Sequence, residues 1–189
     1  MDKIFVLAAL SPPLPVPDWL SSLPPERGAR ISPSLPPNKV SDIVTAYRLL
    51  RHGLREFFSI AEMPEIALEE KGKPFFPGEK NPHFSLSHTD GGAMCALSAM
   101  PVGADIERAR AVNGRLFSRI CGGMQYDEEN FFKEWTAREA AFKLFGEGSL
   151  LAPPVVPEGV TLTHFARCGF FMCVCGQGVA GEPFWVDDM

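Results

Sequence analysis

The fold is decided by two stretches, Val102-Gly-Ala-Asp-Ile-Glu-Arg108 and Trp135-Thr-Ala-Arg-Glu-Ala-Ala-Phe-Lys143. The first predicts the end of a strand, and the second predicts the middle of a helix. Asp105 and Glu107 are two residues apart, so in a strand both side chains point to one face. With Glu139 arriving from the helix, they would form an oxygen-rich site for a hard cation such as Mg²⁺.

Each of these acids also has an ordinary explanation. An exposed Asp or Glu is usually solvated, and a D-x-E pair is common by chance. Glu139 and Lys143 stand four residues apart, in the order that favours an ion pair within the helix worth about 0.3–0.5 kcal/mol. Periodicity alone does not separate such a pair from a metal and phosphate site.

Outward from these stretches, the sequence predicts an α+β fold. Apolar spacing in residues 39–59 indicates a helix that buries one stripe. A second helix should begin after Asp127, with Glu128 and Glu129 in its first turn, and end at Gly146 or Gly148. The other expected elements are strands at 3–10, 84–87, 93–100, 102–107, 161–166, 170–175 and 184–186, a helix near 112–120, a helical turn near 19–23 within a proline-rich loop at 11–37, and a loop at 71–82.

Composition narrows the class of protein. The chain has 189 residues and is 46% hydrophobic, which suits one large globular domain or two small ones. Its net charge of −5 argues against a general nucleic-acid binder. Residues 3–10 are interpreted as a strand rather than a signal segment, and no apolar run is long enough to span a bilayer. We therefore expect a cytoplasmic protein with neither a nucleic acid nor a membrane as its partner.

The five cysteines are predicted to be reduced. Their odd number argues against a disulfide framework. Cys173 and Cys175 lie in an apolar, strand-like run, which favours buried thiols over a zinc site.

Three further motifs carry polar groups. In His83-Phe-Ser-Leu-Ser-His-Thr89, Ser85 and Ser87 share one face of the expected strand, and His88 is expected to begin the turn. This is either a polar hairpin edge or a set of phosphate donors, and no Gly-x-Ser-x-Gly elbow supports a serine hydrolase. The other two are a rigid turn, Gly72-Lys-Pro-Phe-Phe76, and the pair Arg27 and Arg30, which as bare charges would be solvated.

Taken together, the motifs at 72–76, 84–89, 102–107 and 135–143 resemble the 4′-phosphopantetheinyl transferase superfamily in its long, surfactin-synthetase-activating type. They occur in the order and approximate spacing of that family. The resemblance implies an α+β monomer of two pseudo-twofold-related halves, each a small sheet packed with helices. Residues 1–101 would form the half that contacts the coenzyme A nucleotide, and residues 102–189 the half with the metal and phosphate site.

The resemblance also implies an activity. The enzyme would move 4′-phosphopantetheine from coenzyme A to a serine of an acyl or peptidyl carrier protein, with Mg²⁺, and release adenosine 3′,5′-bisphosphate. Asp105, Glu107 and Glu139 would hold the metal, and Lys143 would contact the phosphates. Asp105, Glu139 and Lys143 would thus be the catalytic residues.

By the same resemblance, six further residues would bind coenzyme A together with Lys143. Ser87 and His88 would bind its phosphates. Lys73, with Pro74 beside it, would reach the nucleotide end. Arg27 and Arg30 would sit at the 3′-phosphate, where a fork-shaped guanidinium suits a terminal phosphate.

The chain departs from the family pattern most clearly at 117–130. The family usually carries a glutamate there that helps to deprotonate the attacking serine, whereas this chain reads Phe117-Ser-Arg-Ile-Cys-Gly-Gly-Met124. Glu128 or Glu129 would have to substitute, or Glu139 would act through a water. Two alternatives stay open: a degenerate relative that binds coenzyme A or a carrier protein without transfer, and an unrelated Mg²⁺-dependent phosphohydrolase.

Overall fold

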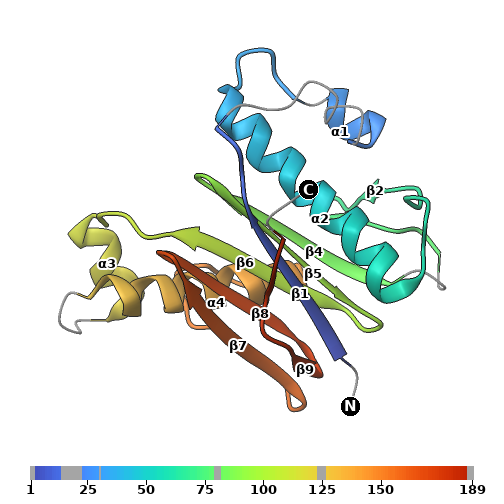
Figure 1. The fold of residues 1–189 in the computed structure, drawn as a ribbon. Coiled ribbons are helices and arrows are strands. Elements are labelled where there is room, and N and C mark those ends of the chain that lie inside the picture. The colour runs from blue at the N-terminus through green and yellow to red at the C-terminus, as the bar shows by residue number, and fades with distance from the viewer. Residues whose placement is uncertain (1–2, 14–22, 30, 79–81, 123–126, 187–189) are drawn as a thin grey trace.

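The computed structural model describes residues 3–13, 23–29, 31–78, 82–122 and 127–186 (Figure 1). Groups of helices and groups of strands follow one another along the chain. In chain order they are β1 Lys3–Leu10, α1 Pro25–Ala29, α2 Pro37–Phe58, β2 Ala67–Leu68, β3 Pro74–Phe75, β4 His83–Thr89, β5 Gly92–Ser98, β6 Val102–Arg108, α3 Gly114–Cys121, α4 Glu128–Phe145, β7 Val160–Arg167, β8 Phe170–Gln177, β9 Val179–Ala180 and β10 Phe184–Trp185.

The first sheet is built on β1. It pairs antiparallel with β5, and β5 pairs antiparallel with β4 across the turn at Asp90 and Gly91. Two short C-terminal strands, β9 and β10, return to pair parallel with β1. Leu7, Ala9, Cys95 and Leu97 form one apolar face of this sheet, and α2 packs on that face.

The second sheet has the order β6-β8-β7, with both pairs antiparallel. Helix α4 covers one face of it, where Ala137, Ala140 and Ala141 contact Cys173 and Cys175. Asp127 caps the start of α4 by accepting from the Glu129 amide at 3.0 Å. Gly146 ends the helix in the left-handed conformation that suits glycine.

The two sheets pack face to face and form the central core. Ile4, Val6 and Ala8 of β1 belong to the same apolar cluster as Val102, Ala104 and Ile106 of β6, because alternate residues of a strand point to opposite faces. The molecule therefore has four layers, α2, first sheet, second sheet and α4, which can be followed in Figure 1.

This mixed architecture confirms the predicted α+β class. The two sheets are built from the same succession of elements along the chain, a strand, a helix and a hairpin. These are β1, α2 and β4–β5 in the first sheet and β6, α4 and β7–β8 in the second. The pseudo-twofold relation and the boundary after residue 101 stay predictions.

The main elements lie where the sequence indicated, with local differences. The loop expected at 71–82 contains β3, which pairs with β2 in a two-residue ladder. Strand β4 runs on to Thr89, so His88 lies inside the strand and not in the turn as expected. The helical turn expected near 19–23 falls mainly outside the described residues, at 14–22.

Most of the cysteines are enclosed by the fold. All five cysteines are free, and four are buried: Cys95, Cys121, Cys173 and Cys175. Within the described ranges, no helix combines the length and apolar character that crossing a membrane requires.

Candidate active site

The site begins with the way α4 lies on β6. Residues of β6 alternate, so Gly103, Asp105 and Glu107 face α4 while their neighbours enter the central core. A Cβ atom added at Gly103 would lie 2.0 Å from the Ala140 carbonyl oxygen. Glycine at 103 therefore lets the helix backbone approach the strand closely, and this brings Lys143 of α4 to Asp105.

Asp105 is the buried centre of the site, with only 5% of its surface exposed. Its Oδ1 accepts from Ser87 Oγ at 2.7 Å and from Lys143 Nζ at 2.8 Å. Burial raises the pKa of Asp105, and the Lys143 ammonium and the Ser87 hydroxyl oppose that rise. Oδ2 is buried without a hydrogen-bond partner in the described structure, so this carboxylate has one oxygen still to be satisfied.

Glu139 and Glu107 add negative charge beside Asp105. Burial raises the pKa of Glu139, and the charges of Asp105 and Glu107 raise it further, while Lys143 lowers it. Glu107 Oε2 accepts from Thr89 Oγ1 at 3.2 Å and pairs with Arg110 at 2.6 Å. The three predicted metal ligands are therefore close enough to repel one another.

These residues fit a hard cation in chemistry. A divalent cation would give the free Oδ2 of Asp105 a partner and would reduce the repulsion among the three carboxylates. Oxygen ligands also suit Mg²⁺. Among the described residues, however, no three His, Cys, Asp or Glu side chains are drawn together into a ready-made metal cluster. Lys143 instead bonds to Asp105, and the metal assignment stays a prediction.

A pocket of about 290 Å³ opens beside these acids. Lys73 Nζ reaches into this region and lies 3.4 Å from the Val102 carbonyl oxygen, while Lys143 Nζ lies 3.1 Å from that of Ala104. Burial lowers the pKa of Lys73, and nearby Lys143 adds to this. The pocket is lined by Glu69, Lys71, Gly72, Lys73, Pro74, Ser85, Leu86, Glu139, Phe142, Lys143 and Gly146.

A second pocket, of about 140 Å³, lies on the other side of Pro74 and Leu86, which line both. Arg27, Tyr47 and His88 bring polar groups to it. Burial among protein atoms, together with Lys143, Arg27 and Lys39, lowers the pKa of His88 to about 4, although the side chain also reaches solvent. His88 is therefore a neutral imidazole at pH 7 in a region rich in positive charge.

The predicted site residues are thus largely brought together. Asp105, Glu107, Glu139, Lys143 and Ser87 surround the acid centre, Lys73 and Pro74 line the adjoining pocket, and Arg27 and His88 line the second pocket. Arg30 lies outside the described residues. Ser87 and His88 point to opposite faces of β4, so they cannot act as neighbours on one phosphate in the way the expected turn would allow.

Arg138, one residue before Glu139, has a structural position. Only 3% of it is exposed, and its guanidinium donates to the Ile120 carbonyl at 2.7 Å and the Leu150 carbonyl at 3.3 Å. It thereby ties α4 to the end of α3 and to the segment after α4.

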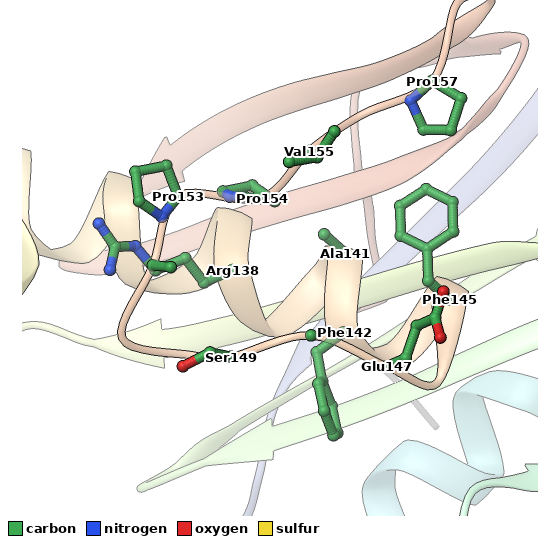
Figure 2. Close-up of a pocket in the computed structure, with 12 residues that line it drawn as sticks. Arg138, Ala141, Phe142, Phe145, Glu147, Ser149, Pro153, Pro154, Val155 and Pro157 are labelled. Atoms are coloured by element: carbon green, nitrogen blue, oxygen red, sulfur yellow. The ribbon is translucent and has the colours of Figure 1, made fainter.

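Another pocket, of about 460 Å³, lies under the segment 147–157, which passes over the C-terminal half of α4 (Figure 2). Phe142 lines both this pocket and the one beside the acids. The sequence carried no signal for it, because its wall is a proline-rich segment without regular structure.

Two hydroxyls make contacts that the sequence did not indicate. Ser85 Oγ accepts from the Ala104 amide at 2.9 Å, and Thr89 Oγ1 accepts from the Arg108 amide at 3.2 Å. The alternation of Ser85, Ser87 and Thr89 was visible, but nothing in the sequence indicated that β6 would lie opposite them.

Several curated proteins are similar to this chain over part of its length. The 4′-phosphopantetheinyl transferase Sfp of Bacillus subtilis (strain 168) is 29% identical over 93 residues, which are 44% of this chain and 42% of that protein. The 4′-phosphopantetheinyl transferase gsp of Aneurinibacillus migulanus is 33% identical over 89 residues, 42% of this chain and 37% of that protein.

A third relative extends the match. The 4′-phosphopantetheinyl transferase psf-1 of Bacillus pumilus is 30% identical over 112 residues, 53% of this chain and 48% of that protein. The chain thus spans less than half the length of the curated relatives it matches. No protein-family model matches the chain. The matches confirm the resemblance to the 4′-phosphopantetheinyl transferase superfamily that the four motifs indicated.

Proposed function

We propose that this protein is a Mg²⁺-dependent 4′-phosphopantetheinyl transferase that uses coenzyme A as donor and a serine of an acyl or peptidyl carrier protein as acceptor. One observation carries the proposal: a buried acid, Asp105, with a free carboxylate oxygen lies against Lys143, which lines one pocket together with Lys73, and a second pocket containing Arg27 and His88 adjoins the first at Pro74 and Leu86. Acids beside several cations suit a metal together with a polyphosphate.

Each charged part of coenzyme A would find a partner in this arrangement. Its 3′-phosphate would meet Arg27 and the imidazole of His88 in the smaller pocket. The nucleotide would lie along Pro74 and Lys73, and Lys143 would contact the pyrophosphate. Ser87 would contribute by holding Asp105, to which its hydroxyl donates in the free protein.

The reaction requires positioning and charge neutralisation more than covalent help. The carrier serine oxygen forms a bond to the β-phosphorus, and the bond from that phosphorus to the bridging oxygen breaks. The bridging oxygen leaves with adenosine 3′,5′-bisphosphate. Mg²⁺, held by Asp105, Glu107 and Glu139, would supply charge neutralisation at the phosphates.

The protein itself must accept the serine proton. Glu139 would take it through a water molecule. Lys143, held at Asp105, would neutralise charge on the departing phosphate. Glu129 is a poorer candidate base because it is exposed and pairs with Lys133 at 2.6 Å.

A second candidate function is a degenerate binder of coenzyme A or of a carrier protein. The observation that favours it is the complete absence of Asp and Glu between Glu107 and Asp127, where the family carries its additional glutamate. Such a protein would keep both pockets but lack an efficient base.

Product analysis separates the candidates. Protein, coenzyme A and Mg²⁺ are incubated with and without a panel of apo carrier proteins, and released adenosine 3′,5′-bisphosphate is measured by chromatography. Release that requires a carrier supports the transferase, and release without one supports a phosphohydrolase. A protein that binds coenzyme A but releases no adenosine 3′,5′-bisphosphate with any carrier, including those of the host, would support the degenerate binder and contradict the transferase.

Two remaining parts of the proposal concern the oligomeric state and the cellular location of the protein. We expect a monomer, to be checked by light scattering. We expect a cytoplasmic location, to be checked by fractionation of the host cell.

A further inference from the structure

Side-chain hydrogen bonds connect the two sheets where β4 lies beside β6. Strand β4 is the last strand of the first sheet, and β6 is the first strand of the second. The amides of Ala104 and Arg108 donate to the hydroxyls of Ser85 and Thr89. Hydroxyls on one face of β4 therefore satisfy backbone groups at the edge of β6.

The same face of β4 also contacts the acids. Ser87 Oγ donates to Asp105 Oδ1 at 2.7 Å, and Thr89 Oγ1 donates to Glu107 Oε2 at 3.2 Å. Each acid thus has its own hydroxyl, and the two pairs repeat with the same separation of 18 residues.

The orientation of the Thr89 hydroxyl is fully determined. An amide can only donate, so the Arg108 N–H takes an acceptor position on Oγ1. The single hydroxyl proton is then free for Glu107, which as a carboxylate can only accept. Thr89 is buried, with 8% of its surface exposed, and it is held by the strand on which it stands.

The other partner of Glu107 is a weaker constraint. Arg110 pairs with the same oxygen, but 59% of the arginine side chain is exposed. Arg110 also donates to the Arg108 carbonyl at 3.2 Å and lies over the Phe132 ring, but its exposed ion pair contributes little. The buried hydroxyl is therefore the contact that holds the Glu107 carboxylate from the protein interior.

We propose that Thr89 is a positioning residue, which holds the Glu107 carboxylate beside Asp105 so that the two can bind one divalent cation. This inference rests on the proposed function and adds a residue that does not itself touch metal or substrate. Outer groups that hydrogen-bond a metal ligand typically change metal affinity by about 10–100-fold when removed.

The test measures metal binding directly, with Mn²⁺ as a paramagnetic probe titrated into protein saturated with coenzyme A. Thr89→Val removes the hydroxyl and keeps the shape, and Thr89→Ser keeps the hydroxyl. Thr136→Val is the matched control, because its buried hydroxyl bonds only to backbone carbonyls of α4 in the described structure. If Thr89→Val does not fold, Thr89→Ala, which leaves room for a water at the Arg108 amide, replaces it.

We expect Mn²⁺ affinity to fall about tenfold in Thr89→Val, to recover in Thr89→Ser and to be unchanged in Thr136→Val. Coenzyme A affinity measured in EDTA should be the same in all four proteins. Equal Mn²⁺ affinity in Thr89→Val and the native protein would overturn the inference, as would the absence of Mn²⁺ binding to the native protein. Native protein that binds Mn²⁺ but modifies no carrier would refute the transferase and leave Thr89 to be decided by the affinities.

Discussion

The two helices cover their sheets in different ways. Helix α2 meets an apolar face, with Leu7, Ala9, Cys95 and Leu97 below it. Helix α4 packs its alanines against the cysteines of β8, but on β6 it faces Gly103, Asp105 and Glu107. The same order of strand, helix and hairpin thus encloses a mainly apolar layer in one case, with Asp42 buried near the start of α2, and a charged layer in the other.

The difference indicates which layer stabilises the fold and which layer serves the chemistry. Burial of a carboxylate is unfavourable even when it is paired, and replacement of a buried pair by apolar groups is often neutral or stabilising. The layer beneath α2 contributes hydrophobic stabilisation. The charged layer beneath α4 is better explained by function, so substitutions in the two layers should affect different measurements.

The largest expected effect on activity is that of Asp105→Ala. Transfer should fall by about 10³-fold or more, because the charge at the centre of the site is lost. The melting temperature should change little, because the desolvation cost of the carboxylate is removed and the partly exposed Lys143 can turn its ammonium to solvent. Steady-state transfer and thermal melting check the two halves of this statement, and undiminished transfer would refute the metal and catalytic assignments.

Leu50→Ala should do the reverse in the layer beneath α2. Leu50 is fully buried, and a Leu→Ala change in a core typically costs about 2–5 kcal/mol. Urea unfolding measures the loss, and the transfer rate per folded molecule should stay close to that of the native protein. Leu10→Ala, at a side chain that is 61% exposed, is the control that should leave stability unchanged.

Gly103→Ala tests the close contact of α4 with β6. The added Cβ would meet backbone atoms of Ala140 and Leu144, which cannot rotate away. We expect a loss of about 1–3 kcal/mol together with reduced transfer, because the helix that carries Glu139 and Lys143 must shift. Gly114→Ala, where a Cβ meets nothing within 4 Å, should change neither quantity.

The smallest expected effect is proton uptake by His88 when coenzyme A binds. His88 has a pKa of about 4, below its ordinary value of 6.5, so it is neutral at pH 6 in the free protein. A bound phosphate would raise that pKa, so coenzyme A binding at pH 6 should take up protons. Calorimetry in buffers of different ionisation enthalpy measures this uptake. It should disappear in His88→Gln, and equal uptake in both proteins would separate His88 from the phosphates.

Much of the frame could be predicted from local sequence. Asp127 with two following glutamates marked the start of α4, and Gly146 marked its end. The spacing of Asp105 and Glu107 correctly placed both on one face of a strand. These features succeed because caps and alternation act within a few residues of the chain.

The remaining features depend on contacts between distant segments. The return of β9 and β10 to β1 joins residues about 175 positions apart, and two-residue strands carry no periodic signal. The Ser87–Asp105 and Thr89–Glu107 bonds require β4 and β6, the end strands of the two sheets, to lie side by side. Nothing in the residues next to Arg138 indicated its burial, because the Ile120 and Leu150 carbonyls reach it only through tertiary packing.

The central claim is that the charged layer between β6 and α4 carries phosphopantetheinyl transfer. The most direct measurement is the intact mass of an apo carrier protein after incubation with coenzyme A and Mg²⁺, with native protein and with Asp105→Asn in parallel. We predict a gain of one phosphopantetheine with the native protein, lost in EDTA and absent with Asp105→Asn. A carrier panel that never gains mass, or an equal gain with Asp105→Asn, would contradict the claim.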